Sequence, residues 1–277
     1  MSEPLLVVDR LGVDFRRHRQ VFTALDDISF DIAPGETVGL VGESGSGKTT
    51  IGRTILGLVK PSRGTIAFRG QDITHASCTT RRALSRDIQV VFQDPYTSLN
   101  PSLSIEDILA EPLRAQGVGR SEASRRVREL LDRVRLPRDA ADRLPREFSG
   151  GQRQRIAIAR ALALRPRLIV CDEPVSALDL STQQRVLDLF IELQRQTECA
   201  YLFVSHDLSV IRHISHRVLV LNRGRLVESG SVDKITSTPD HPYTRRLLMS
   251  APLPDPVAQR ERRARLEAVI AGAPAAD

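Results

Sequence analysis

The first 41 residues alternate short apolar runs with turn signals. The runs lie at Leu5–Val8, Val13–Phe15, Ile28–Ile32 and Thr37–Val41, and Ala33-Pro34-Gly35 separates the last two. Short runs bounded by Pro and Gly predict β-strands. Two further strands are expected at residues 63–70 and 88–92. This part of the chain is therefore predicted to be rich in sheet.

Helical periods replace this alternation from residue 105 onward. Apolar residues share one face of the segment 122–134, and Ile, Leu and Ala recur through 153–164. Strands return at 168–171, 201–204 and 218–221, with a helical segment at 183–196. Strands that alternate with helices predict βαβ units and a largely parallel sheet. We expect an α/β domain over residues 1–235, interrupted by a helical subdomain at about 94–160. A segment at 236–277 follows, whose Pro- and Arg-rich part past Pro239 is expected to be peripheral.

A phosphate-binding loop is predicted between the strand ending at Val41 and the helix that follows it. The residues are Gly42, Glu43, Ser44, Gly45, Ser46, Gly47, Lys48, Thr49 and Thr50, which fit the pattern G-x-x-x-x-G-K-[ST]. The glycines let backbone N–H groups point at phosphate oxygens, and the helix N-terminus adds partial positive charge. Lys48 is expected to reach the β- and γ-phosphates, and the Thr49 hydroxyl to ligate Mg²⁺. A Gly/Ser turn that merely links strand to helix is the alternative.

Two adjacent carboxylates, Asp172 and Glu173, follow the apolar strand at 168–171. The carboxyl ends of parallel strands are where such sheets bind ligands. One carboxylate can hold the Mg²⁺ shell, and the other can accept a proton from an attacking water. For the pair on its own, a surface loop is the alternative, but the combination of these carboxylates with the phosphate loop favours a nucleotide site.

A second loop of free N–H groups is predicted at Ser149, Gly150 and Gly151, just before a helix. One chain seldom needs two phosphate-facing loops for one triphosphate. Two copies of the chain could share the ligand, each giving one loop. The alternative is that Ser149 simply caps the helix.

These residues together resemble the ATP-binding cassette (ABC) ATPases. The segment Phe148–Gln152 is similar to that family's signature sequence, and Ser176–Asp179 to its D-loop. Gln93 matches the Q-loop, and His206 matches the switch histidine. The resemblance covers residues 5–235. It implies a RecA-like P-loop core with an antiparallel β subdomain and an inserted α-helical subdomain, and ATP hydrolysis with Mg²⁺.

The same resemblance implies roles for residues that bind ATP and its metal. Phe15 would stack on adenine, with Phe22 as the second candidate and core packing as the alternative for either. Gln93 would ligate Mg²⁺ together with Thr49, and Asp172 would act through the water shell of the metal.

The resemblance also implies the catalytic and partner-facing residues. Glu173 would be the general base, and His206 would contact the γ-phosphate and hold the water in line. Ser149, Gly150, Gly151 and Gln152 would complete the site of the opposite subunit. Asp179 would lie across the interface.

Three regions, 93–101, 111–113 and 239–256, resemble the dipeptide/oligopeptide/nickel importer subfamily. This implies ATP-driven import of peptides or a similar small solute. The partners would be a second ABC ATPase subunit (identical or different), two transmembrane permease subunits and an extracytoplasmic solute-binding protein. The chain would lie peripherally at the cytoplasmic face of the inner membrane. A nickel or other-solute importer ATPase, or a non-transport cassette ATPase of the phosphonate-breakdown type, is the alternative.

Composition changes this picture little. The net charge of +6 could suggest nucleic acid, but the basic residues are spread along the chain and aromatic residues make up only 4%. Too few aromatics are present for base stacking, so no nucleic-acid partner is expected. No stretch approaches the roughly 20 apolar residues of a membrane span, and the N-terminus lacks a signal-peptide pattern. No cysteine follows Cys199, so the iron–sulfur ligand set of many subfamily members is not expected.

Overall fold

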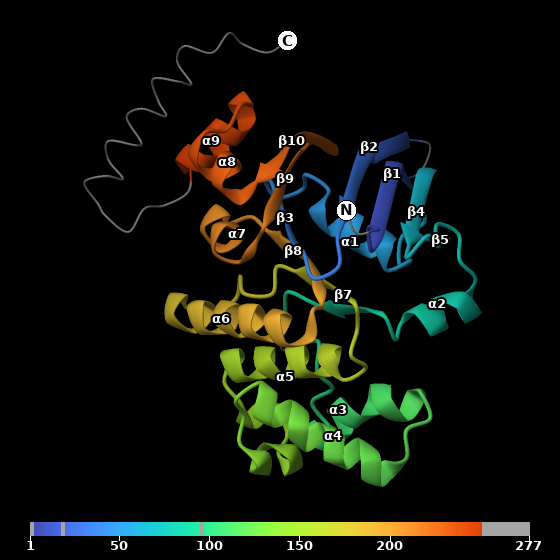
Figure 1. Ribbon diagram of the computed structural model, residues 1–277, viewed down its shortest axis with the longest axis vertical. Helices are drawn as coiled ribbons and strands as arrows, with labels where there is room; N and C mark the ends of the chain where they lie inside the picture. The colour runs from blue at the N-terminus through green and yellow to red at the C-terminus, as the bar shows by residue number, and fades with distance from the viewer. Residues whose placement is uncertain (1–2, 18–19, 95–96, 251–277) are drawn as a thin grey trace.

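The computed structural model describes residues 3–17, 20–94 and 97–250. Within them, six strands form a sheet in the order β10-β9-β3-β8-β7-β6 (Figure 1). The strands are β3 (Thr37–Val41), β6 (Ile88–Val91), β7 (Leu168–Asp172), β8 (Ala200–Ser205), β9 (Arg217–Asn222) and β10 (Arg225–Ser231). All neighbours pair in parallel except β9 and β10. Strands β3 and β8 are buried along their whole length, as expected for a parallel sheet covered on both faces.

A second, antiparallel sheet has the order β2-β1-β4-β5. Its strands are β1 (Leu6–Arg17), β2 (Gln20–Ile32), β4 (Arg63–Phe68) and β5 (Gln71–Asp72). The predicted runs at 5–8 and 13–15 belong to one long strand, β1, whose pairing with β2 shifts register between Val8 and Asp14. Such bulges bend a strand without ending it, which is why the sequence pattern is broken there.

The antiparallel sheet and one face of the parallel sheet enclose α1 (Lys48–Ile55). Ile51 and Ile55 of α1 are fully buried in the same cluster as Leu6 and Ile28 of the antiparallel sheet and Val38 of β3. The core therefore fixes the start of α1, and with it the loop that precedes it, against both sheets.

The chain between β6 and β7 is mainly helical. It contains α3 (Ile105–Ala115), α4 (Arg120–Arg133), two short 3₁₀ turns (Arg138–Asp142 and Pro145–Glu147) and α5 (Gly150–Leu162). Figure 1 shows α3 and α4 at the end of the molecule away from β2 and β10, with α5 between them and α6 (Leu180–Thr197). Ser104 caps α3 by accepting from the Asp107 N–H at 3.2 Å. A capping box likewise starts α5 at Gly150, three positions before the predicted start at 153.

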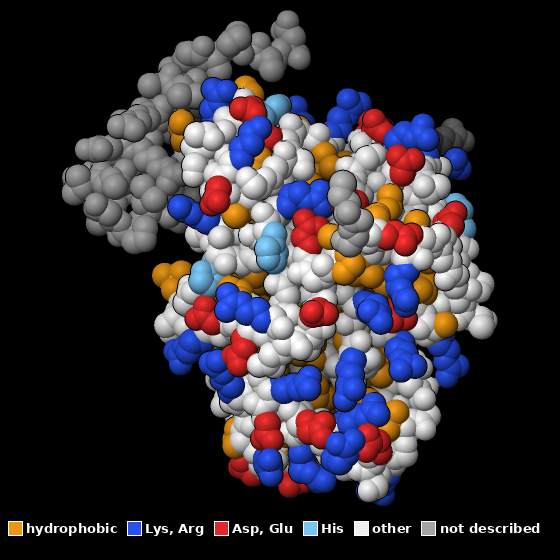
Figure 2. Space-filling model, in the orientation of Figure 1, with side chains coloured by type: hydrophobic (Ala, Val, Ile, Leu, Met, Phe, Trp, Pro, Cys, Tyr) orange, Lys and Arg blue, Asp and Glu red, His pale blue; other side chains and the backbone are white. Residues whose placement is uncertain are grey.

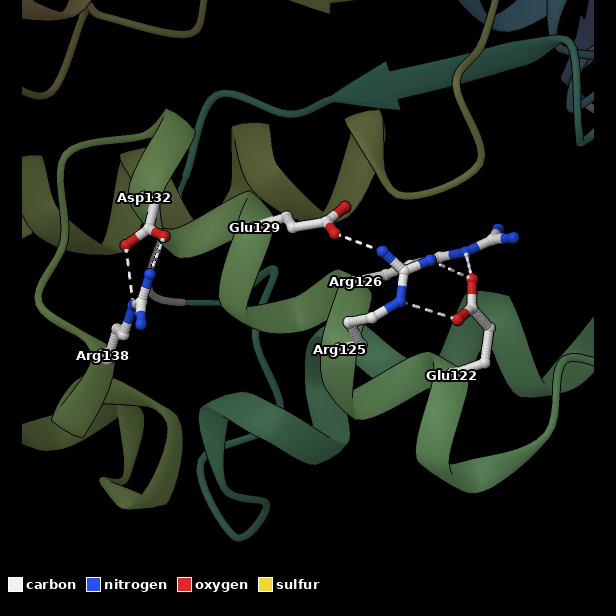
Figure 3. A network of polar contacts seen from close by, with 6 residues as sticks. All are labelled: Glu122, Arg125, Arg126, Glu129, Asp132 and Arg138. Atoms are coloured by element: carbon white, nitrogen blue, oxygen red, sulfur yellow. Dashed lines mark hydrogen bonds and ion pairs between the residues drawn. The ribbon is translucent and has the colours of Figure 1, made fainter.

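Ion pairs cover the exposed side of α4 (Figure 3). Arg125 pairs with both Glu122 and Glu129, and Arg126 also donates to Glu122, at 2.7 Å. These hydrogen bonds, from Arg125 first and then Arg126, lower the pKa of Glu122 to about 2. Such exposed i,i+3 and i,i+4 pairs support a helix only weakly. On the face in Figure 2, acidic and basic side chains are interspersed and form no single-signed stripe.

The remaining helices are α2 (Cys78–Leu84), α7 (Leu208–Ile214), α8 (Val232–Ser237) and α9 (Pro242–Ser250). Figure 1 shows α8 and α9 beside β9 and β10. Tyr243 and Leu247 of α9 are buried in the main core. Residues 240–250 are thus packed on the domain, and the rest of the segment expected to be peripheral, 251–277, lies outside the described residues. Among the residues described, we find no helix that is both long enough and apolar enough to span a membrane.

Candidate functional site

The predicted phosphate loop connects β3 to α1 and leaves the start of that helix open. Gly47 caps α1 with φ 110° and offers no side-chain hydrogen bond to its first N–H groups. A Cβ atom there would lie 2.7 Å from Leu25 Cδ2, so only glycine fits. Uncapped N–H groups and the helix dipole make this end of α1 suited to an anion.

Lys48 is folded back onto this loop. Its Nζ donates to the carbonyl oxygens of Gly42, at 2.7 Å, and Glu43, at 2.8 Å, and the side chain is almost fully buried. Burial lowers the pKa of Lys48, and the nearby carboxylates of Glu173 and Asp172 oppose that shift. A buried cation at the mouth of an open helix end reinforces the preference for a negatively charged ligand.

Thr49 and Asp172 meet although they are far apart in the sequence. The Thr49 hydroxyl donates to Asp172 Oδ1 at 3.0 Å. Burial raises the pKa of Asp172, against the effect of the Thr49 hydrogen bond, and repulsion from Glu173 raises it further. Paired hydroxyl and carboxylate oxygens suit a hard cation such as Mg²⁺. The described residues contain no cluster of three or more His, Cys, Asp or Glu that could hold a metal.

Glu173 leaves the end of β7 in a left-handed conformation, with φ 50°. Its N–H donates to the Val204 carbonyl at 3.0 Å, which binds it to β8. One carboxylate oxygen lies 3.1 Å from Nδ1 of His206, the residue that follows β8. A non-glycine residue held at positive φ stores strain of the kind that is common at functional sites. The ends of the neighbouring strands β7 and β8 thus bring the side chains of Glu173 and His206 into hydrogen-bond contact.

A cavity of about 350 Å³ joins these elements. Its lining consists of Phe15, Phe22, Ala24, Ser44, Gly45, Gly47, Lys48, Thr49, Thr50, Gln93 and Glu173. Phe15 and Phe22 lie opposite each other on β1 and β2, and both are partly exposed, by 42% and 65%. The two candidates for adenine stacking therefore line one wall together. Asp172 and His206 do not line the cavity, but each is hydrogen-bonded to a residue that does, Asp172 to Thr49 and His206 to Glu173.

The second predicted loop lies elsewhere. Ser149, Gly150, Gly151 and Gln152 start α5, and none of them lines this cavity. The Ser149 N–H donates to Gln152 Oε1 at 2.9 Å, and Ser149 Oγ accepts from the Gln152 N–H at 3.4 Å. Within a single chain, Ser149 is therefore a helix cap, which was the alternative interpretation.

Asp179 also caps a helix. It accepts from the Thr182 N–H at 3.0 Å and from the Ser181 hydroxyl at 2.8 Å at the start of α6. Hydrogen bonds from Thr182 and then Ser181 lower the pKa of Asp179 to about 2. The two capped ends touch, because a Cβ on Gly151 would lie 2.2 Å from Thr182 Cγ2.

Two residues near the site were not predicted from the sequence. Ala24 lines the cavity from β2, and Tyr243 of α9 accepts a hydrogen bond from the Glu43 N–H in the phosphate loop at 3.0 Å. Both contacts are made by residues far from the loop in sequence, so no local motif marks them.

Comparison with known proteins agrees with this geometry. Residues 25–176 match the family model described as ABC transporter. This chain belongs to the ABC transporter family. Residues 227–273 also match the model described as Oligopeptide/dipeptide transporter, C-terminal region; of these, residues 251–273 lie outside the described part of the chain. The chain is thus an ATP-binding ATPase of the cassette type, as the motifs predicted.

Two proteins described as peptide transport ATP-binding proteins align in sequence with most of this chain. A "Putative peptide import ATP-binding protein" of Brucella ovis is 50% identical over 260 residues, covering 94% of this chain and 82% of that protein. "Oligopeptide transport ATP-binding protein OppD" of Mycobacterium tuberculosis is 51% identical over 245 residues, covering 88% of this chain and 40% of that protein.

Solved structures confirm the fold class. The ATP-binding cassette MJ0796, in a dimeric post-hydrolysis state bound to ADP and Pi, has a TM-score of 0.74 at 29% identity. That match covers 82% of this chain and 98% of the other. CbiO1 from Clostridium perfringens, part of the ABC transporter complex cbiONQ, has a TM-score of 0.78 at 26% identity, over 86% of this chain and 92% of the other.

Proposed function

We propose that this chain hydrolyses ATP to drive the import of peptides or similar small solutes, as one ATPase subunit of a membrane complex. ATP hydrolysis is inferred mainly from one cavity that is lined by the phosphate loop, Gln93 and Glu173. Nδ1 of His206 lies 3.1 Å from the Glu173 carboxylate at this site. The match of residues 227–273 and the peptide import relatives support the class of solute.

Phosphate binding is proposed to use the open end of α1. The N–H groups of Gly45 to Thr50 receive the phosphate oxygens, and Lys48 exchanges the carbonyls of Gly42 and Glu43 for phosphate oxygens. Phe15 stacks on the adenine, with Phe22 opposite it on the neighbouring strand. These contacts hold the triphosphate with its γ-phosphate toward Glu173.

Thr49 and Gln93 are proposed to ligate Mg²⁺, with Asp172 acting through the water shell of the ion. The hydrogen bond between Thr49 and Asp172 supports this, because it brings two oxygens of the required kind together. When bound, the ion neutralises charge on the phosphates.

Glu173 is proposed to be the general base. Its carboxylate accepts a proton from the attacking water, and the hydrogen bond to His206 fixes the orientation of that carboxylate. The left-handed backbone at Glu173 turns its side chain from the strand direction toward the cavity. His206 is half exposed and is therefore accessible to the γ-phosphate as well.

The active form is proposed to be a pair of cassettes. Ser149, Gly150, Gly151 and Gln152 lie outside the cavity of their own chain, and they are proposed to contact the nucleotide held by a second subunit. The contact of Gly151 with Thr182 keeps this loop beside Asp179, so both face the same partner.

Membrane subunits are proposed to dock at an apolar groove of about 270 Å³ beside β6. The groove is lined by Ile55, Leu56, Leu58, Arg81, Leu84, Ser85, Ile88, Gln89, Val90 and Phe92. Leu58 is 64% exposed, and Phe92 directly precedes Gln93 of the cavity. A short apolar helix of a permease seated there would lie next to Gln93, which follows Phe92 in the chain. This arrangement makes the chain a peripheral subunit of a membrane assembly.

Glu173→Gln tests the catalytic proposal. The variant should lose about 10²–10⁴-fold in ATPase rate while still binding ATP, because an amide cannot accept the proton. Glu198→Gln is a matched control, since Glu198 is also in a left-handed conformation, φ 53°, but lies outside the cavity. Hydrolysis by Glu173→Gln at the rate of Glu198→Gln would exclude the base assignment.

The paired site is tested in the Glu173→Gln background. Size-exclusion chromatography with Mg²⁺ and ATP should show a dimer, and adding Ser149→Arg should abolish it without reducing ATP binding. A dimer that survives Ser149→Arg would contradict the shared site. Co-purification with permease subunits, and its loss in Leu58→Glu, separates an importer from a cassette that works without membrane partners.

A further inference from the structure

The hydroxyl of Tyr243 is bound to the phosphate loop. It accepts a hydrogen bond from the Glu43 N–H at 3.0 Å, across 200 residues of sequence. Tyr243 lies in α9 and is 4% exposed, so its hydroxyl reaches the loop from inside the core. Burial raises the pKa of Tyr243, although the hydrogen bond from Glu43 acts in the opposite direction. The hydroxyl is therefore neutral at physiological pH and a stable acceptor.

Glu43 is the second residue of the phosphate loop, which runs from Gly42 to Thr50. Its carbonyl accepts from the Ser46 N–H at 3.2 Å and from Lys48 Nζ at 2.8 Å. Three hydrogen bonds thus meet on one residue: the Glu43 N–H donates to Tyr243, and the Glu43 carbonyl accepts from Ser46 and Lys48. A shift of Glu43 would move both the turn of the loop and the resting position of the Lys48 ammonium.

The segment that carries Tyr243 is itself tightly held. Glu228 of β10 accepts from the N–H groups of Asp240, at 2.7 Å, and His241, at 3.2 Å. His241 Nδ1 accepts from the Tyr243 N–H at 3.1 Å, and Arg245 donates to the Asp240 carbonyl at 2.7 Å. This turn fixes the start of α9, so Tyr243 is a rigid support for the loop.

We propose that Tyr243 is a positioning residue for the phosphate loop, through which the C-terminal segment sets the affinity of the site for nucleotide. The inference rests on the loop being the ATP site, as proposed above. Because Glu43 sits before the N–H groups expected to bind phosphate, its tether pre-organises them. Removing the tether would leave these groups to be ordered at the moment of binding.

Tyr243→Phe in the full chain tests the proposal, because it keeps the buried ring and removes only the acceptor. Mg·ATP and Mg·ADP should bind about three- to tenfold more weakly, and the KM for ATP should rise with little change in kcat. Hydrogen–deuterium exchange should be faster in the peptide spanning Gly42 to Thr50. Tyr201→Phe is the matched control, since Tyr201 is equally buried and its hydroxyl donates to Phe190 O at 3.4 Å, outside the cavity.

The outcomes separate the inference from the proposed function. A parent chain that does not bind Mg·ATP would refute the proposed site itself. A parent that binds, with Tyr243→Phe binding within twofold of it and exchanging at the same rate in the loop, would overturn the positioning role alone. Equal weakening by Tyr243→Phe and Tyr201→Phe would also overturn it, because the effect would then follow from any lost core hydroxyl.

Discussion

Alanine substitutions at Gly47 and Gly45 would measure how much stability the phosphate loop gains from having glycine at these two positions. Both have positive φ, 110° and 79°. A Cβ on Gly47 would lie 2.7 Å from Leu25 Cδ2 and 3.0 Å from Ala24 O, whereas a Cβ on Gly45 meets nothing within 4 Å. Left-handed backbone costs alanine roughly 1–2 kcal/mol, and overpacking adds roughly 1–3 kcal/mol. Gly45→Ala should therefore cost about 1–2 kcal/mol of unfolding free energy, and Gly47→Ala about 2–5 kcal/mol.

Thermal unfolding without nucleotide, followed by circular dichroism, measures this difference. One kcal/mol corresponds to about 2–4 °C for a chain of this size, so Gly47→Ala should melt at least about 2 °C below Gly45→Ala. The comparison isolates crowding from backbone strain, because both variants add the same methyl group. The reasoning is refuted if Gly45→Ala melts at the same temperature as Gly47→Ala or below it.

Two further predictions concern the edges of the site. Gly151→Ala should lower the free energy of unfolding by about 1–3 kcal/mol, and with it the thermal midpoint. The reason is that the added Cβ would lie only 2.2 Å from Thr182 Cγ2. Thr182→Ser removes that methyl and should recover most of the loss in the double variant; additive losses would contradict the contact. Asp172→Asn should be more stable than the parent at pH 7. Burial raises the folded pKa of Asp172, so the parent loses stability as pH rises through that value. The advantage of the variant should disappear toward pH 3.8 in melts from pH 4 to 8; an advantage that grows on acidification would contradict the burial argument.

The fold could be predicted from the sequence where the signal is local. The apolar runs before Gly42 and Asp172 lie on β3 and β7, which are parallel strands in one sheet. The residues of the phosphate loop are contiguous in sequence, so its pattern could be recognised although glycine at Gly47 also relieves a tertiary contact with Leu25. Periodicity was also sufficient for the helices between β6 and β7.

Boundaries and distant contacts could not be predicted in the same way. The start of α5 at Gly150 depends on the capping box of Ser149 and Gln152, whereas the apolar period begins only later. Strand β1 runs through a bulge that breaks its alternation. Tyr243 reaches Glu43 because α9 packs beside β9 and β10, and no spacing in the sequence encodes that docking. Helix and strand boundaries and contacts between distant residues therefore depend on capping and packing that the hydrophobic pattern does not encode.

The Ser149 loop illustrates why sequence patterns alone left two interpretations. Within one chain, Ser149 caps α5, and this explains its residue type completely. The cap is nevertheless weak and exposed, because Ser149 Oγ accepts from the Gln152 N–H at 3.4 Å, near the upper limit of a hydrogen bond. A phosphate brought by another subunit could take over the N–H groups at this helix end at little cost. In the proposed pair of cassettes, the residues that cap α5 in the free chain would serve as a phosphate loop once a second subunit is bound.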